Sequence, residues 1–176
     1  CQPCRPALSE GHNSACGAEG LSMTKPQTPI HVELVAVTDA IRSRVAALEL
    51  AEGQQDLVAC NQDSLLEADE DPDARPTAIL IDADLVGFLM YDATSEPATA
   101  QLYRLMIDRR YQGRGYGFAA LQTFLAEIRS ITAIKQVSIC YEPGNFAARQ
   151  LYAKAGFVEQ GIDADGEMIA ILPCRT

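Results

Sequence analysis

Apolar residues along the first third of the chain change from strand-like to helical spacing. Residues 31–37 (HVELVAV) are rich in β-branched side chains, which predicts a strand. Thr38 follows as a candidate helix N-cap. One face of the predicted helix carries three apolar residues at helical spacing, Ile41, Val45 and Leu48. A second, weaker helix is expected within residues 58–70, ended by Asp71-Pro72-Asp73.

The spacing then becomes that of strands. Residues 77–81 and 85–92 predict two strands around a short hairpin turn, Asp82-Ala83-Asp84. A third strand is expected at residues 101–107. It runs directly into a glycine-rich sequence and a helix that ends near Ser130. The apolar face of this helix contains Phe118, Leu121, Leu125 and Ile128.

The last 40 or so residues predict one more strand–helix unit and a hairpin. A strand is expected at 136–141, and a helix opens at Pro143-Gly144-Asn145 and stops at Gly156, a favourable residue after a helix C-terminus. Strands at 157–162 and 167–172 flank an Asp165-Gly166 turn. The order β-α-α-β-β-β-α-β-α-β-β predicts an α+β domain of mixed hairpins and crossovers.

Composition limits the class of protein. The 176 residues, 48% of them hydrophobic, fit one globular domain. The longest apolar run, residues 85–91, falls far short of the roughly 20 residues of a membrane span, and no basic amphipathic segment suggests a membrane surface. A net charge of −10 disfavours nucleic acid as a partner. It suits cationic small molecules, although acidic chains are often acidic only for solubility.

Residues 1–29 are expected to be a flexible leader or an upstream extension, with the domain at 30–176. Met23 is a candidate start of the natural chain, because periodic sequence begins only after Pro29. No signal peptide is recognisable, so reduced cysteines and a cytoplasmic location are expected. Four residues of the leader have zinc-ligand side chains, Cys1, Cys4, His12 and Cys16. Their spacing fits no common zinc finger, and the prediction is that no metal is bound.

The glycine-rich sequence, Gln112-Gly113-Arg114-Gly115-Tyr116-Gly117, lies between a strand and a helix. Alternating glycines let several main-chain amides turn toward one ligand, and the following helix adds its positive end. Arg109, Arg110 and Arg114 place three cations beside it. These features predict a pyrophosphate site. The alternative is a plain turn that caps a helix.

Two kinds of phosphate ligand are disfavoured. A nucleoside-triphosphate loop needs Gly-Lys followed by Ser or Thr, which is absent here. A dinucleotide fold needs an acidic residue about 20 positions further on. That region holds Val137 and Ser138 instead.

Residues 105–117 (LMIDRRYQGRGYG) and 145–157 (NFAARQLYAKAGF) resemble the two signatures of the GNAT superfamily of acyl-CoA-dependent N-acetyltransferases. The resemblance extends over residues 31–172. It implies a central, mostly antiparallel sheet of six to seven strands, splayed between the fourth and fifth strands and flanked by about four helices. It also implies acetyl-CoA as co-substrate, bound in the gap between those two strands, and a homodimer.

The same resemblance implies residue roles. Main-chain groups of Leu105, Met106 and Ile107 would bind the pantetheine arm. The pyrophosphate would lie on the amides of Gln112, Gly113, Arg114, Gly115, Tyr116 and Gly117. Asn145 and Tyr152 would lie near the thiol end, although Asn145 is also a candidate N-cap and Tyr152 a candidate core residue.

These residue types suit direct acetyl transfer to an amine. The amine must lose a proton before attack, and the thioester oxygen that becomes negative needs a donor, for which an amide near Met106 is expected. Tyr152 is the predicted acid that protonates the departing thiolate. Glu142 is the predicted base, acting directly or through water; the alternative interpretation is a solvated carboxylate of the loop.

Within the superfamily the chain is most similar to bacterial diamine and spermine/spermidine N-acetyltransferases, through residues 84–92, 102–117 and 141–145. Residues 61–73 carry six carboxylates and no cation, which would attract a polycation or form a solvated acidic face. Tyr103 and Glu142 are expected to face the acceptor. Aminoglycosides, amine toxins and protein amines stay open as acceptors. A non-catalytic acyl-CoA sensor is the alternative function.

Overall fold

The computed structural model describes residues 30–54 and 60–174. The predicted leader and its four candidate zinc ligands lie outside these residues. Within them, helices and strands follow one another in the predicted order, β-α-α-β-β-β-α-β-α-β-β.

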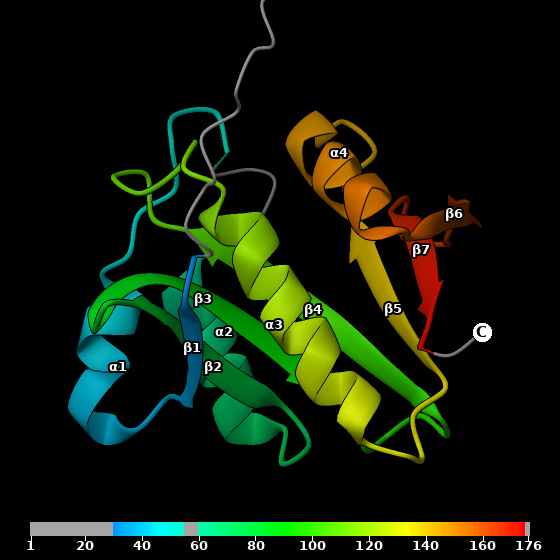
Figure 1. Ribbon diagram of the computed structural model, residues 1–176, viewed down its shortest axis with the longest axis horizontal. Helices are drawn as coiled ribbons and strands as arrows, with labels where there is room; N and C mark the ends of the chain where they lie inside the picture. The colour runs from blue at the N-terminus through cyan, green and yellow to red at the C-terminus, as the bar shows by residue number, and fades with distance from the viewer. Residues whose placement is uncertain (1–29, 55–59, 175–176) are drawn as a thin grey trace, which may run out of the picture.

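One seven-stranded sheet organises the described residues, in the order β1-β2-β3-β4-β5-β7-β6 (Figure 1). Neighbouring strands are antiparallel except β4 and β5, which are parallel. This arrangement confirms the predicted fold class. The strands are β1 (Val32–Ala36), β2 (Arg75–Ile81), β3 (Asp84–Asp92), β4 (Thr99–Ile107), β5 (Gln136–Tyr141), β6 (Val158–Ile162) and β7 (Met168–Pro173).

Four helices cover the sheet on its two faces. They are α1 (Asp39–Ala46), α2 (Asn61–Glu70), α3 (Tyr116–Ser130) and α4 (Phe146–Ala155). Helices α3 and α4 pack on one face through a core that includes Ile79, Leu89 and Phe124. Helices α1 and α2 pack on the other face, where Ala78, Phe88 and Met90 are buried (Figure 1). The alternation of adjacent residues between these two cores explains why β2 and β3 read as nearly continuous apolar runs.

The hairpin between β2 and β3 has a turn of two residues, Asp82 and Ala83, both with positive φ (50° and 68°). Such turns match the twist of the flanking strands, and Asp tolerates this conformation better than most residues. Two strands begin two residues earlier than the pattern predicts, β2 at Arg75 and β4 at Thr99. Thr38 occupies the N-cap position of α1, but its side chain makes no capping hydrogen bond.

The sheet opens between β4 and β5. Their parallel pairing covers only residues 99–102 of β4 and 136–139 of β5. Residues 103–107 of β4 continue beyond the last pair and stay joined to β3 on their other side. A gap therefore separates the carboxyl ends of β4 and β5, at the topological position where α/β sheets usually bind ligands.

Within residues 30–54 and 60–174, no helix is long and apolar enough to cross a bilayer.

Candidate functional site

A cavity of about 420 Å³ occupies the gap beside the end of β4. It is lined by the end of β4, the glycine-rich loop, the first turn of α3 and one side of α4. Ten of the predicted site residues line it: Leu105, Met106, Ile107, Gln112, Gly113, Gly115, Tyr116, Gly117, Asn145 and Tyr152. Arg114, Glu142 and Tyr103 are not among its lining residues.

The register of β3 and β4 decides which amides face this gap. Opposed residues of antiparallel strands alternate between pairs that exchange two hydrogen bonds and pairs that exchange none. The Asp108 amide donates to the Val86 carbonyl at 2.9 Å, one position beyond the last pair of the register. Two positions earlier, Met106 lies opposite Phe88. The main-chain groups of Met106 therefore point toward β3.

The main-chain groups that face the gap are those of Leu105 and Ile107. The alternation turns the main-chain groups of these two residues away from β3 and toward β5. They have no partner on β5, because the pairing of β4 with β5 ends at Leu102. The Ile107 carbonyl instead accepts a hydrogen bond of 2.8 Å from Gln112 Nε2. Near Met106, where a donor for the reacting oxygen is expected, the main-chain amides that face the gap are therefore those of Leu105 and Ile107, while the main chain of Met106 faces β3.

The glycine-rich loop holds its amides ready for a ligand. Gly113 and Gly115 have φ of 75° and 82°, a conformation in which other L-residues are strained. Gly115 is also the N-cap of α3. Among the described residues, none accepts a hydrogen bond from the amides of residues 112–115, and the first amides of α3 have no acceptor within the helix. This is the arrangement expected of a phosphate-binding loop.

Two side chains fix the loop to the rest of the sheet. Gln112 Nε2 donates to the Ile107 carbonyl and, at 2.9 Å, to Gln54 Oε1. Asp108 is 1% exposed and accepts hydrogen bonds from the Arg110 guanidinium, the Arg110 amide and the Glu49 amide. Burial raises the pKa of Asp108, but these hydrogen bonds outweigh burial and lower the pKa to about 2. Asp108 is therefore ionised in the folded protein at neutral pH.

The three arginines near the loop are not equivalent. Arg110 pairs with Asp108 at 2.8 Å, and Arg109 pairs with Glu49 at 2.7 Å. Arg114 forms no ion pair within the described residues, and its guanidinium lies 5.7 Å from the centre of the Tyr111 ring. The sequence suggested three available cations; among the described residues, Arg109 and Arg110 have carboxylate partners and Arg114 has none.

Tyr152 is buried on α4 with its ring against those of Tyr141 and Phe157, 5.6 Å away in each case. No described residue hydrogen-bonds its hydroxyl. Burial, and after it the neighbouring Tyr141, raises the pKa of Tyr152 well above the ordinary value of 10.0. The phenol thus keeps its proton at neutral pH. Tyr152 lines the cavity and also belongs to the core, so the two interpretations of it are compatible.

Asn145 likewise combines two positions. Its side chain accepts a hydrogen bond of 3.0 Å from the Ala148 amide, which is the N-cap bond of α4. It lines the cavity as well. The helix ends as predicted at Gly156, with φ of 97°.

The residues predicted to meet the acceptor lie apart from this cavity. Glu142 is exposed in the loop that follows β5, and its carbonyl accepts from the Asn145 amide at 2.8 Å. Tyr103 packs on the opposite face of the sheet, 3.5 Å from Asp92 through its hydroxyl. Burial and then the Asp92 carboxylate raise the pKa of Tyr103.

The acidic segment at residues 61–73 is partly neutralised. Glu67 pairs with Arg104, and Asp69 pairs with Arg42. Asp73 accepts from the hydroxyls of Thr94 and Ser95, which joins the segment to the loop after β3. None of its carboxylates lines the cavity at the end of β4.

Gly87 is one residue whose importance sequence reasoning missed. A Cβ at this position in β3 would lie 2.5 Å from the Met106 carbonyl oxygen and 2.8 Å from the Ile107 side chain. Glycine at position 87 therefore allows β3 and β4 to approach closely in the part of β4 that no longer pairs with β5. A lone glycine inside a strand pattern is the signal that would have found it. Leu50 and Gln54 also line the cavity, from a segment with no recognisable motif.

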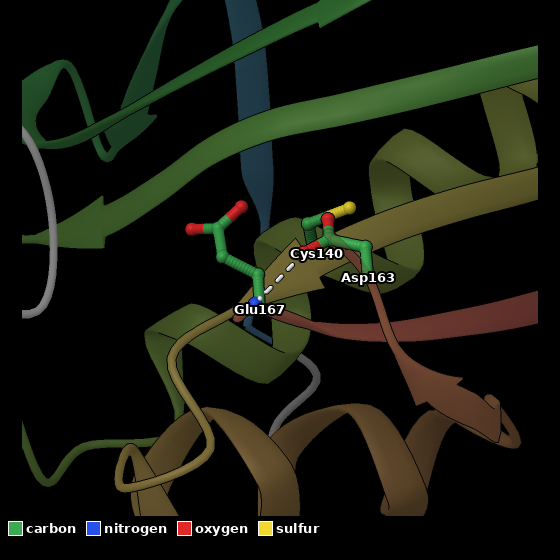
Figure 2. A group of neighbouring side chains, drawn as sticks. All are labelled: Cys140, Asp163 and Glu167. Carbon is green, nitrogen blue, oxygen red and sulfur yellow. Dashed lines mark hydrogen bonds between the residues drawn. The ribbon is translucent and has the colours of Figure 1, made fainter. Parts of the chain in front are cut away.

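A second group of titratable side chains lies near the carboxyl end of β5, outside the lining of the first cavity. Cys140 on β5 lies beside Asp163 and Glu167, which flank the turn between β6 and β7 (Figure 2). The Asp163 carboxylate accepts from the amides of Asp165 and Glu167, at 2.9 Å each, so it already stabilises that turn. Burial, followed by the two carboxylates, raises the pKa of the Cys140 thiol.

Comparison with known proteins agrees with this geometry. The sequence profile of the Acetyltransferase (GNAT) family matches residues 38–157, more than half of the chain. The chain belongs to the GNAT acetyltransferase family. It is accordingly an acyltransferase of the class that uses acetyl-CoA. The match spans β4, the glycine-rich loop and α4, which together line the cavity.

Relatives within the GNAT family differ in their acceptors. The spermine/spermidine N(1)-acetyltransferase of Bacillus subtilis (strain 168) is 28% identical over 147 residues, which are 80% of this chain and 97% of that protein.

Two solved GNAT structures are similar in fold. The ribosomal-protein-S18-alanine N-acetyltransferase of Escherichia coli has a TM-score of 0.64 at 17% identity, over 83% of this chain and 96% of that one. An aminoglycoside acetyltransferase in complex with coenzyme A has a TM-score of 0.69 at 14% identity, over 81% and 95%. Three different acceptors on one fold mean that the fold alone does not identify the acceptor here.

Proposed function

We propose that this GNAT protein transfers the acetyl group of acetyl-CoA directly to a primary amine, and that the acceptor is a polyamine or a diamine. The observation that carries the acetyl-CoA part is the cavity between β4, the glycine-rich loop and α4, whose loop amides have no acceptor among the described residues. A diphosphate on those amides would direct the attached chain along β4, toward Tyr152.

The reaction on this surface is an acyl substitution. The amine nitrogen attacks the thioester carbon, the C–N bond forms and the C–S bond breaks. The carbonyl oxygen becomes negative in between, and the amide of Leu105 or Ile107 is the donor oriented to stabilise it. The departing thiolate takes a proton, and the amine nitrogen loses one.

Tyr152 is proposed to protonate the sulfur, and Glu142 to accept the amine proton, directly or through water. The pKa of the Tyr152 phenol lies above that of a thiol, which is about 8.5. The phenol therefore begins as a hydrogen-bond donor to the thiolate, before any proton transfer. The exposed position of Glu142 favours a route through water.

The polyamine assignment is supported by the Bacillus subtilis relative and by the net charge of −10. A homodimer in the cytoplasm stays a prediction of the resemblance and composition.

Thiol release from acetyl-CoA, measured against a panel of amines, tests the proposal. The panel contains spermidine, spermine, putrescine, an aminoglycoside, a peptide with a free N-terminus and a neutral-tailed monoamine. We expect the highest kcat/KM with a polyamine or a diamine. Preference for the monoamine or the peptide would overturn the acceptor assignment. Acetyl-CoA binding without thiol release for any amine would overturn the enzymatic one.

A further inference from the structure

A second cavity, of about 540 Å³, adjoins the proposed acetyl-CoA site. It lies between the end of α1, the first turn of α2 and β4. Leu50 and Met106 line both cavities, so the two meet at the segment of β4 where the thioester is expected. An amine in the second cavity would thus approach the reacting carbon from the side opposite α4.

The charge of this second cavity suits a neutral group better than a cation. Its two charged lining residues, Glu49 and Arg109, pair with each other at 2.7 Å. The first turn of α2 adds the positive end of a helix. The other lining residues are uncharged. Ala46, Leu48, Leu50 and Met106 are apolar, and the remaining three are Cys60, Asn61 and Gln62. An ammonium ion is destabilised in such surroundings relative to the free amine that must attack.

Asn61 is the buried polar residue of this cavity, at 6% exposure. Its Nδ2 donates to the Val45 carbonyl at 3.0 Å and weakly to Met106 Sδ at 3.7 Å. A carbonyl only accepts hydrogen bonds, so the Asn61 amide must turn its nitrogen toward Val45. Its Oδ1 is thereby fixed on the other side, and no described residue donates to it. The oxygen is accessible from the cavity, so water or a ligand there can donate to it.

We infer that Asn61 Oδ1 accepts a hydrogen bond from the nitrogen of the acceptor amine and positions it for attack. This inference rests on the proposed function and names one contact of its acceptor site. The occupant is a primary amine on an alkyl chain, whose methylene groups lie against Leu48, Leu50 and Met106. A neutral amide oxygen orients the amine without stabilising the ammonium form, as a carboxylate at this position would.

Three variants test the inference. Asn61→Ala removes Oδ1, and we expect kcat/KM for the amine to fall roughly ten- to hundredfold, with acetyl-CoA affinity unchanged. Asn61→Asp places a charge beside the amine, and the rise of kcat/KM with pH should move upward by about one pH unit. Ser64→Ala is the matched control. Ser64 is 1% exposed in the same first turn of α2, donates to the Cys60 carbonyl and lines neither cavity.

Ser64→Ala should lower the midpoint of unfolding but leave the KM for the amine unchanged. Unchanged kcat/KM in Asn61→Ala would overturn the inference. So would a loss of the same size in Ser64→Ala, because the effect would then be structural only.

Calorimetric binding of the amine in the presence of coenzyme A separates this inference from the proposed function. If the wild type binds amines without releasing thiol, and Asn61→Ala loses the binding, the contact stands and the enzymatic proposal fails. If the wild type releases thiol and Asn61→Ala binds amines equally well, the contact fails alone.

Discussion

Tyr152 is a packing residue of the core and also the proposed acid of the reaction. Its ring lies between Tyr141 and Phe157, and its hydroxyl has no hydrogen-bond partner among the described residues. Because burial raises its pKa, the proton needed by the thiolate is present throughout the neutral range. Tyr152→Phe keeps the ring and its packing but removes the hydroxyl, and with it that proton.

We expect Tyr152→Phe to lower kcat by roughly ten- to several-hundredfold. Acetyl-CoA affinity and the midpoint of unfolding should change little, since the ring stays in place. Steady-state kinetics and direct acetyl-CoA binding measure the two effects. Wild-type turnover in Tyr152→Phe would remove the phenol from the mechanism.

Asp108 gives a prediction about stability and pH. Its pKa is lowered from 3.8 to about 2 by hydrogen bonds that outweigh burial. A lowered pKa in the folded state stabilises the fold above the unfolded-state pKa, and this contribution is lost as the pH falls through the folded value. The contribution amounts to about 2 kcal/mol at neutral pH.

Asp108→Asn should therefore lower the free energy of unfolding by about 2 kcal/mol at pH 7. The difference from the wild type should shrink below about pH 4 and vanish near pH 2. Urea unfolding across this range measures it. Asp84→Asn, at an exposed residue with no side-chain hydrogen bond in the described part of the chain, is the control and should show little difference at any pH. A pH-independent loss in Asp108→Asn would contradict the role of its charge.

At the scale of helices and strands, the order of elements was predictable because apolar spacing changes wherever the structure does. The boundaries were less predictable. Proline is disfavoured in a central strand, yet β2 includes Pro76, which lies opposite Met90 of β3 and accepts a hydrogen bond from the Val37 amide through its carbonyl. Proline lacks the main-chain N–H donor but keeps its carbonyl, and at this end of β2 it is the carbonyl that forms the hydrogen bond.

In the glycine-rich loop, an effect on ligand binding can be separated from an effect on stability by comparing Gly113 with a glycine of similar conformation elsewhere in the chain. Gly113 and Gly166 both have positive φ, 75° and 90°, and a Cβ at either would meet no atom within 4 Å. Alanine at either position thus costs backbone strain alone, about 1 kcal/mol. Gly113 lies in the loop and Gly166 in the turn between β6 and β7.

We expect Gly113→Ala and Gly166→Ala to lower the free energy of unfolding to a similar extent. Only Gly113→Ala should weaken acetyl-CoA binding, by roughly three- to tenfold, because strain at residue 113 turns the loop amides away from the diphosphate. Calorimetry with acetyl-CoA and urea unfolding give the two readings. Equal acetyl-CoA affinity in both variants would show that the loop geometry does not determine binding.

At the scale of the whole molecule, the sequence predicted the parts of the site better than their surroundings. The two family signatures identified both walls of the first cavity. The loop residues bind partners that are distant in the sequence and belong to no recognised motif: Arg109 forms an ion pair with Glu49, and Gln112 donates a hydrogen bond to Gln54. Such long-range pairs depend on how the segment after α1 packs against the loop after β4, which local spacing does not encode.

The acidic segment shows the same limit. Six carboxylates at 61–73 suggested an exposed acidic mouth, but folding brings Arg42 and Arg104 against two of them. Attraction of a polycation then depends on the net charge of −10 over the whole chain more than on this segment. Such long-range attraction is screened by salt, over a Debye length of about 10 Å at 0.1 M.

The rate of capture should therefore depend on both the charge of the amine and the ionic strength. From low salt to 0.15 M we expect kcat/KM to fall by roughly tenfold for spermidine and about twofold for a monoamine of similar length. Acetyl-CoA, an anion, should show the opposite trend in its own kcat/KM. Initial rates at several salt concentrations measure all three. Parallel salt profiles for spermidine and the monoamine would mean that the protein's charge does not select a polycation, and the acceptor would then be sought among singly charged amines.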